Sequence, residues 1–366
     1  RRDRAHDQAD QVARLTASLP LPQVHLPMVF AAGLSADDVV VLRVERRTRD
    51  GSGAEAPVSG SFAIEGTIVG DGRTWDRGGR NAFTTDMHKT QSIDYAIELE
   101  GERVLGMDDG RHTIHQGDIV VQVGAWHQWS SRAPGGSLVM FDMIAAKFVD
   151  GPVGLAQGND RVMTAAANHT IPGGVKPTRR IVCLDREPNK STLASDAATP
   201  DVRTDPARPG FAAQRIWVTD RTPARIEGVT ETLDMPHTLE PPAGGSVCRI
   251  VTFPPDRDYL SKVTAKDVQN YFEAMGSPGA STHHAKAPHP YMQKTRTLDF
   301  CLILEGEITL VLDTGEVHLK QGDTVVQRGT NHAWSNRSGK PVRMLYIMID
   351  GKLDPELAAA LGGAHG

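Results

Sequence analysis

Two stretches of the sequence place histidine and aspartate at matching positions. In the first stretch, His88, Asp94 and His127 supply two imidazoles and one carboxylate. In the second, Asp299 and His332 stand at the matching places. Imidazoles and carboxylates ligate divalent transition metals, and the same groups move protons as general acids and bases. The residue types of the first stretch therefore fit either metal binding or acid–base catalysis.

The residues from 88 to 94 predict a β-strand with a polar face. His88, Thr90, Ser92 and Asp94 alternate along it, and alternate residues of a strand share one face. A polar face is ordinary on a sheet exposed to solvent. Here, however, Asp94 leads directly into an apolar run typical of a core strand. We therefore expect Asp94 to point into the interior of the fold, with Thr90 and Ser92 as neighbours that contact a substrate.

A second polar group follows a tight turn at Gly124. His127 comes three residues after this glycine and lies between Trp126 and Trp129. A histidine that tryptophans shield from water needs a hydrogen-bond partner or a chemical role. We expect His127 to be a catalytic residue together with Asp94. Gln122 and Trp129 are expected to contact the substrate, although packing in the wall of the fold is an equally physical role for the tryptophan.

The elements that position these residues occur twice. The two copies align without a gap over residues 87–144 and their counterparts, and they share turn glycines, the aspartate, the histidine and a tryptophan. A repeat of this length indicates a duplicated domain. Short apolar runs separated by glycine- and proline-containing turns predict antiparallel strands in a sandwich or barrel. The fold class is therefore all-β, with two barrels in tandem.

The chain divides into five expected segments. These are an N-terminal helical arm at 1–20, a first barrel at 21–150, a connector at 151–178, a second barrel at 179–350 and a C-terminal helix and tail at 351–366. Residues 255–287 have no counterpart of equal length in the first half, so we interpret them as an insertion. Residues 187–210 are polar and rich in proline, and we expect an exposed loop there.

The two repeated blocks resemble the two motifs of the cupin superfamily. The first family motif is H-x-H followed by Glu and Gly, and this sequence has His88, Thr90, Asp94 and Gly101 at those places. The second family motif ends P-x-G-x-x-H, and this sequence has Q-x-G-x-x-H ending at His127. The resemblance covers both repeat cores and implies a two-barrel bicupin of jelly-roll type.

The family resemblance implies a metal site in the first barrel. One divalent transition metal, Fe(II), Mn(II), Ni(II) or Zn(II), would be held by His88, Asp94 and His127. The second family histidine is replaced by Thr90, and Asp94 is one methylene shorter than the usual Glu. In the second copy Gln293 replaces the first histidine beside Asp299 and His332, so we expect that barrel to have a degenerate site.

Three functions follow from this interpretation. The first is a metal-dependent enzyme acting on a small organic acid, aromatic or polyketide-like, with a preference for dioxygenase chemistry over decarboxylation or isomerisation. The second is a metal-free isomerase, cyclase or dehydratase that uses His127 as acid and base. The third is a small-molecule-binding protein without catalysis. The aspartates shared by both copies also fit a structural role as hydrogen-bonding residues inside each barrel.

Composition and net charge argue against some classes of binding partner. The net charge of −5 and the pI near 6.3 argue against a nucleic-acid ligand, and no apolar run is long enough for a membrane span. The three cysteines are widely spaced, which is typical of a reducing compartment. We therefore expect a cytoplasmic protein with a small-molecule substrate. The family resemblance adds a homo-oligomer, with the N-terminal helix as a plausible interface.

Overall fold

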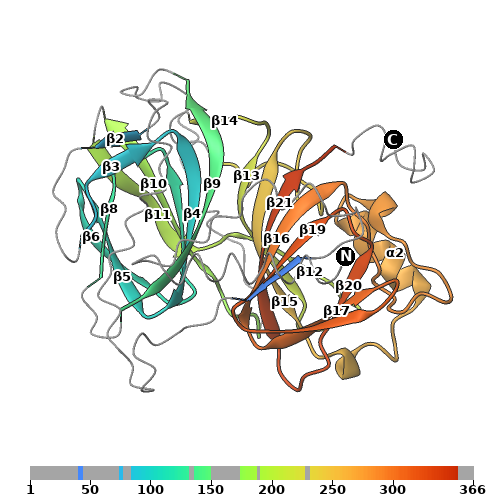
Figure 1. Cartoon of the computed structure of the whole chain (residues 1–366). Coiled ribbons are helices and arrows are strands. Elements are labelled where there is room, and N and C mark those ends of the chain that lie inside the picture. Colours follow the sequence, from blue (N-terminus) through green and yellow to red (C-terminus); the bar gives the residue numbers. More distant parts are fainter. Residues whose placement is uncertain are drawn as a thin grey trace, which may run out of the picture.

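The computed structural model describes residues 40–43, 74–76, 84–131, 136–149, 174–187, 190–226 and 231–352. The helical arm expected at 1–20, most of the connector and the C-terminal helix lie outside these residues. Within them the fold is all-β, as predicted, and it consists of two barrel-like units side by side (Figure 1).

The N-terminal barrel is built from a large sheet and a small one. The six-stranded sheet has the order β11-β10-β7-β4-β9-β14, and the three-stranded sheet has the order β6-β5-β8. Their bounds are β4 Ser92–Glu100, β5 Glu102–Met107, β6 Gly110–His115, β7 Ile119–Val123, β8 Gln128–Ser130, β9 Leu138–Phe148, β10 Arg179–Glu187, β11 Lys190–Ala198 and β14 Ala224–Ile226. β2 (Thr74–Asp76) and β3 (His88–Thr90) form a separate antiparallel pair. A tight turn at Asp108 and Asp109 joins β5 to β6.

The C-terminal barrel repeats this plan. Its seven-stranded sheet has the order β1-β19-β16-β21-β15-β13-β12, and its small sheet has the order β18-β17-β20. The bounds are β1 Val40–Arg43, β12 Asp201–Thr204, β13 Ala212–Thr219, β15 Ser246–Phe253, β16 Thr297–Glu305, β17 Glu307–Leu312, β18 Glu316–Lys320, β19 Asp323–Arg328, β20 His332–Ser335 and β21 Val342–Asp350.

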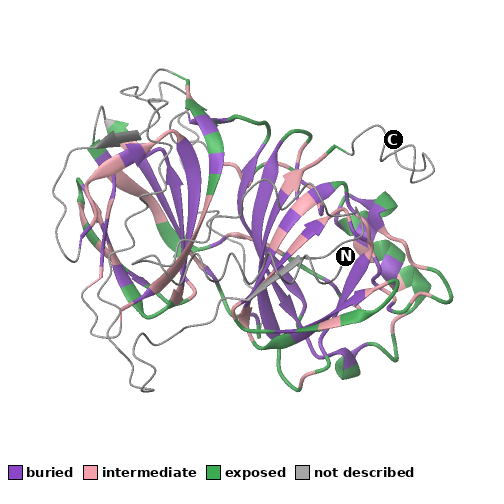
Figure 2. Cartoon of the chain, in the orientation of Figure 1, coloured by how far each residue is buried: buried purple, intermediate pink, exposed green. Residues whose placement is uncertain are grey.

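The two large sheets pack against each other through their outer faces. Tyr95 and Ile97 of β4 belong to the same apolar cluster as Ile250 of β15 and Ile347 of β21. Ala96, between them in sequence, faces the other way and packs in the interior of the N-terminal barrel. β4 is therefore buried on both faces, which explains its nearly continuous apolar run. Figure 2 shows this buried strand layer in the middle of the molecule.

Strand pairing crosses the expected segment boundaries. β1 pairs with β19 of the C-terminal barrel, although it was expected in the first barrel. β10 pairs in parallel with β7 of the N-terminal barrel, although residues from 179 onward were expected in the second. β1 is therefore part of the C-terminal sheet, and β10 is part of the N-terminal sheet. The prediction of a loop at 187–210 is wrong, because β11 and β12 occupy most of it.

The insertion expected at 255–287 contains a helix. α2 (Ala265–Ala274) begins after a capping box in which Thr264 and Asp267 bond reciprocally. Two short 3-10 helices flank it, η2 (Asp256–Asp258) and η3 (Pro278–Ala280). Phe272 of α2 is fully buried in a cluster with Tyr259 and Tyr291. The insertion therefore has a small apolar core of its own, at the end of the C-terminal barrel away from the other unit (Figure 1).

No helix in the described part of the chain has the length and apolar character that crossing a bilayer requires.

Candidate functional site

His88 and His127 lie side by side at one end of the N-terminal barrel. Their backbones form a two-way bridge, in which each N–H donates to the other residue's carbonyl at 2.9 Å. The imidazole centroids are 4.3 Å apart. The turn before His127 requires Gly124, which has φ +57°; a Cβ there would meet Phe148 at 2.8 Å. The prediction that the two histidines belong to one site is consistent with this geometry.

Each of these imidazoles is oriented by a backbone carbonyl. His88 Nδ1 lies 2.8 Å from the Asp86 carbonyl oxygen, and His127 Nδ1 lies 2.9 Å from that of Ala125. Because a carbonyl only accepts, each Nδ1 carries the proton and donates it. In the neutral tautomer of such a ring, the lone pair is on Nε2. Burial, together with His88, holds the pKa of His127 well below its ordinary value, so His127 is neutral at pH 7.

Asp94 is buried in the same barrel and keeps one oxygen without a partner. Thr90 donates to Asp94 Oδ2 at 3.3 Å, and Ser92 donates to the Thr90 hydroxyl at 2.8 Å. Asp94 Oδ1 has no hydrogen-bond partner among the residues that the structure describes. Burial raises the pKa of Asp94 from 3.8 to about 7, Asp142 adds to the rise, and the two hydroxyl groups oppose it. At neutral pH this carboxyl group is poised between its two protonation states.

Gln122 and Trp129 add further unpaired polar atoms to the barrel interior. Gln122 of β7 lies directly opposite Asp94 of β4, so the two side chains share a face. Neither amide atom of Gln122 has a partner, and neither does Nε1 of Trp129. Buried polar groups in proteins are nearly always paired with protein, water or ligand. The substrate contacts predicted for these two residues are thus compatible with the structure.

The metal site predicted from His88, Asp94 and His127 is not assembled. In the part of the chain that the structure describes, no three histidine, cysteine, aspartate or glutamate side chains form a group that could hold a metal ion. Asp94 instead accepts a hydrogen bond from Thr90. The histidine pair fits two positions of a metal's ligand shell, but the three-ligand set does not fit.

The second barrel keeps the buried aspartate and the histidine, but its histidine accepts a hydrogen bond from a glutamine. His332 Nδ1 donates to the Thr330 carbonyl at 2.8 Å, so Nε2 carries the lone pair. Gln293 Nε2 lies 3.3 Å from that Nε2 and donates to it. Asp299 repeats Asp94, with an unpaired Oδ1 and a pKa raised to about 7 by burial. The site predicted to be degenerate has therefore lost its histidine pair and retained its buried carboxyl group.

Two residues that position the histidines were not identified from the sequence. Lys89 faces away from His88 and forms a buried ion pair with Asp185 of β10 at 2.7 Å. The other carboxylate oxygen of Asp185 accepts the backbone N–H of Trp126 at 3.1 Å. This link holds the turn that carries His127. The signal in the sequence was a lysine on the strand face that continues into Ile93 and Tyr95, but its partner is distant in sequence.

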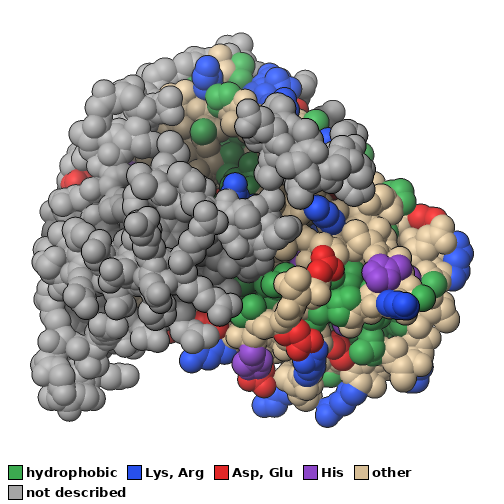
Figure 3. Space-filling view, turned by 45° about the vertical axis from the view of Figure 1, so that its right-hand side comes forward, with side chains coloured by type: hydrophobic (Ala, Val, Ile, Leu, Met, Phe, Trp, Pro, Cys, Tyr) green, Lys and Arg blue, Asp and Glu red, His purple; other side chains and the backbone are tan. Residues whose placement is uncertain are grey.

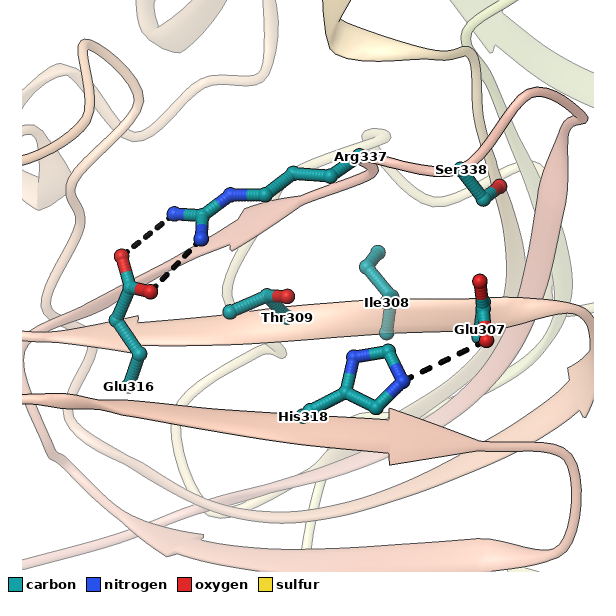
Figure 4. Close-up of a pocket in the computed structure, with 7 residues that line it drawn as sticks. All are labelled: Glu307, Ile308, Thr309, Glu316, His318, Arg337 and Ser338. Atoms are coloured by element: carbon teal, nitrogen blue, oxygen red, sulfur yellow. Dashed lines mark hydrogen bonds and ion pairs between the residues drawn. The ribbon is translucent and has the colours of Figure 1, made fainter.

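The exterior offers a weaker candidate. A pocket on the outer face of the small C-terminal sheet is lined by seven residues (Figure 4), namely Glu307, Ile308, Thr309, Glu316, His318, Arg337 and Ser338. Arg337 forms two hydrogen bonds with Glu316, and His318 contacts Glu307 at 3.5 Å. The charged groups of the pocket thus satisfy one another. The face turned forward in Figure 3 likewise mixes acidic and basic side chains.

Comparison with known proteins identifies a cupin domain. Residues 278–348 match the family described as Cupin domain. The chain is 46% identical over 77 residues to phomopsin biosynthesis cluster protein C′ of Diaporthe leptostromiformis, which covers 20% of this chain and 41% of that protein. It is 31% identical over 147 residues to the cupin-domain-containing oxidoreductase virC of Hypocrea virens, covering 38% and 59% respectively. The chain therefore spans from 41% to 59% of the length of these relatives.

A solved structure aligns more loosely over a longer range. The putative glyoxylate-induced protein from Pseudomonas aeruginosa matches 77% of this chain and 82% of its own, at 12% identity and a TM-score of 0.36. The family match lies within the C-terminal barrel and shows a cupin domain there.

Proposed function

We propose that the chain is an enzyme whose N-terminal barrel performs acid–base chemistry on a small organic acid. The N-terminal barrel has the same plan of a large and a small sheet as the C-terminal barrel, which contains the cupin domain at residues 278–348. The observation that carries this proposal is the buried Asp94 carboxyl group, with a pKa of about 7 and an unpaired Oδ1. General acid–base catalysis is most efficient when the pKa of the group lies near the working pH. Asp94 meets this condition inside a barrel that also offers Gln122, His88 and the neutral imidazole of His127.

In the metal-free function expected from the sequence, His127 is the acid and base. We assign this role to Asp94 instead. His127 has too low a pKa to be protonated near neutrality, so it serves as a neutral hydrogen-bond acceptor through Nε2. Asp94 carries the proton. In an isomerisation, the ionised Asp94 would remove a proton from the carbon next to a carbonyl group, and the C–H electron pair would move into the enolate. When the carbonyl compound is β,γ-unsaturated, this enolate is conjugated with the second double bond, and return of the proton from Asp94 to the γ carbon completes the reaction without an external oxidant.

Deuterium exchange tests this proposal without knowledge of the physiological substrate. The purified chain is incubated in D₂O with acetoacetate and with phenylpyruvate, and loss of the C–H signal is followed by proton NMR. We expect exchange above the uncatalysed rate, lost in Asp94→Asn and retained in Asp299→Asn, which makes the same change in the other barrel. Exchange that is absent, or equal in Asp94→Asn and the unmodified chain, refutes the assignment. Binding without exchange would instead indicate a small-molecule-binding protein.

A metal-dependent oxidoreductase, including a dioxygenase, is the second candidate. The observation that favours it is the histidine pair, since anchored Nδ1–H groups with free Nε2 atoms are typical of metal-ligating histidines. A transition metal held by His88 and His127 would supply Lewis-acid or redox chemistry. Elemental analysis of protein prepared without chelators tests this candidate. About one equivalent of metal, lost in His88→Gln, supports it, and a metal content that His88→Gln leaves unchanged contradicts it.

The remaining proposals concern the binding partner, the assembly and the cellular location of the protein. We propose a small molecule as its partner, a homo-oligomeric assembly and a cytoplasmic location. The assembly rests on the resemblance to other two-barrel proteins, and light scattering after size exclusion tests it. A mass equal to one chain would contradict it.

A further inference from the structure

Met143 of β9 lies directly opposite Asp94 in the N-terminal barrel. β4 and β9 pair in antiparallel register, and this register sets Met143 against Asp94. Side chains directly opposite each other share one face of a sheet, with Cβ atoms about 5 Å apart. Gln122 of β7 is opposite Asp94 on its other side. The Asp94 carboxyl group is therefore flanked by a thioether on one neighbouring strand and by an amide on the other.

The face of β9 that carries Met143 is open to solvent at this level. Phe141, two residues earlier on the same face, packs in the interior of the N-terminal barrel, whereas Ile144 packs between the two barrels. Met143 nevertheless has an exposed fraction of 42%. From Met143 to Lys147 exposed and buried residues alternate (Figure 2), and the exposed ones are on the face shared with Asp94. Solvent therefore reaches this wall at the side chain next to the buried carboxyl group.

The second barrel has the same pair of residues but closes it. Met348 of β21 is opposite Asp299, in the register that sets Met143 against Asp94. Met348 is only 4% exposed and belongs to the apolar core of the C-terminal barrel. Tyr271 of α2, in the insertion, packs against the same core. The difference in exposure between the two methionines identifies the first barrel as the one that a small molecule can enter beside its aspartate.

The two sides of Asp94 differ in chemistry. On the β9 side Phe141 and Met143 form an apolar wall, and the Phe141 ring lies 5.7 Å from that of Trp129. A methionine side chain is flexible and polarizable, and it makes favourable contacts with aromatic rings. On the β7 side both amide atoms of Gln122 lack partners among the described residues, so they can bind a carbonyl or carboxylate oxygen. A bound molecule would thus turn its oxygen atoms toward β7 and its apolar part toward β9.

We infer that Met143 contacts the apolar part of the substrate and makes the N-terminal barrel prefer an organic acid that carries a ring. This inference rests on the acid–base function proposed for Asp94 and adds the class of substrate. Met143 has no group that transfers a proton at neutral pH, so it is a specificity-determining residue. Its contact ranks substrates by their apolar part.

Nuclear magnetic resonance of the chain labelled with carbon-13 at the methionine methyl groups tests this contact. Phenylpyruvate is the probe, and pyruvate is the matched acid without a ring. We expect phenylpyruvate to shift the Met143 methyl resonance and pyruvate to shift it much less, while the Met348 resonance stays in place with both. Spectra of Met143→Gln and Met348→Leu assign the two resonances.

Substitution of Met143 provides a second readout. Met143→Gln keeps the length of the side chain and removes its apolar end, so it should weaken phenylpyruvate binding by about tenfold and pyruvate binding far less. Leu260→Gln makes a similar change at an exposed position of the insertion and should leave both affinities unchanged.

Three results would overturn the inference. These are a Met143 resonance that stays in place on saturation with phenylpyruvate, an equal effect of Met143→Gln on both acids, and the absence of phenylpyruvate binding at millimolar concentration. None of these readouts requires turnover. A shifted Met143 resonance without deuterium exchange supports the contact and contradicts the acid–base function, and exchange with an unmoved resonance does the reverse.

Discussion

Replacing Asp94 by asparagine removes a buried carboxyl group and should make folding less sensitive to pH. Asparagine has nearly the same shape, and its carbonyl oxygen can still accept the hydrogen bond from Thr90. The structure raises the pKa of Asp94 from 3.8 to about 7. The folded protein therefore binds this proton more tightly than the unfolded chain does.

The sign and size of the effect follow from linkage. Below a pH of about 4 the group is protonated in both states and contributes no difference. As the pH rises to about 7, the unfolded chain ionises first, so stability is lost. A rise of about three pKa units corresponds to about 4 kcal/mol, at 1.36 kcal/mol per unit. Relative to the unmodified chain, Asp94→Asn should gain about this much stability between pH 4 and pH 8.

Urea unfolding at a series of pH values measures the effect, with tryptophan fluorescence as the readout. Asp299→Asn should behave alike, because burial raises the pKa of Asp299 to the same value. Asp258→Asn, at an exposed position, controls for the loss of one negative charge. If the stability curves of Asp94→Asn and the unmodified chain are parallel across this range, Asp94 does not have a raised pKa and the acid–base proposal loses its basis.

Two further substitutions test how the site is held. Gly124→Ala should lower the free energy of unfolding by about 1–3 kcal/mol in urea titrations, because the positive φ and the contact with Phe148 both resist a Cβ; an unchanged midpoint would contradict this. Lys89→Met should cost about 3–5 kcal/mol, since it leaves the Asp185 carboxylate buried without its cation. Lys89→Arg should restore part of that loss, and equal stability of Lys89→Met and the unmodified chain would show that the pair does not matter.

The sequence was most informative where the repeat and strand alternation acted together. Alternation placed Asp94 on the inward face of a core strand, and the structure has it buried opposite Gln122. The same argument placed Lys89 on the opposite face. The position of His127 beside His88 depended on a turn at Gly124, which the motif already contained. The two-barrel fold followed from the repeat alone.

Other features depend on contacts between residues far apart in the sequence. β1 and β10 each pair with the unit on the other side of an expected boundary, and a strand's own residues do not name its partner. β11 was missed because its polar residues resemble a loop when its edge position is unknown.

The proposed acid–base chemistry depends most directly on the protonation state of the Asp94 carboxyl group. Carbon-13 NMR of the protein labelled at the aspartate side-chain carboxyl carbons, with Asp94→Asn to assign the resonance, reports its titration. We expect an apparent pKa of about 7 for Asp94. A titration midpoint near 4, the ordinary value for an aspartate, would contradict it.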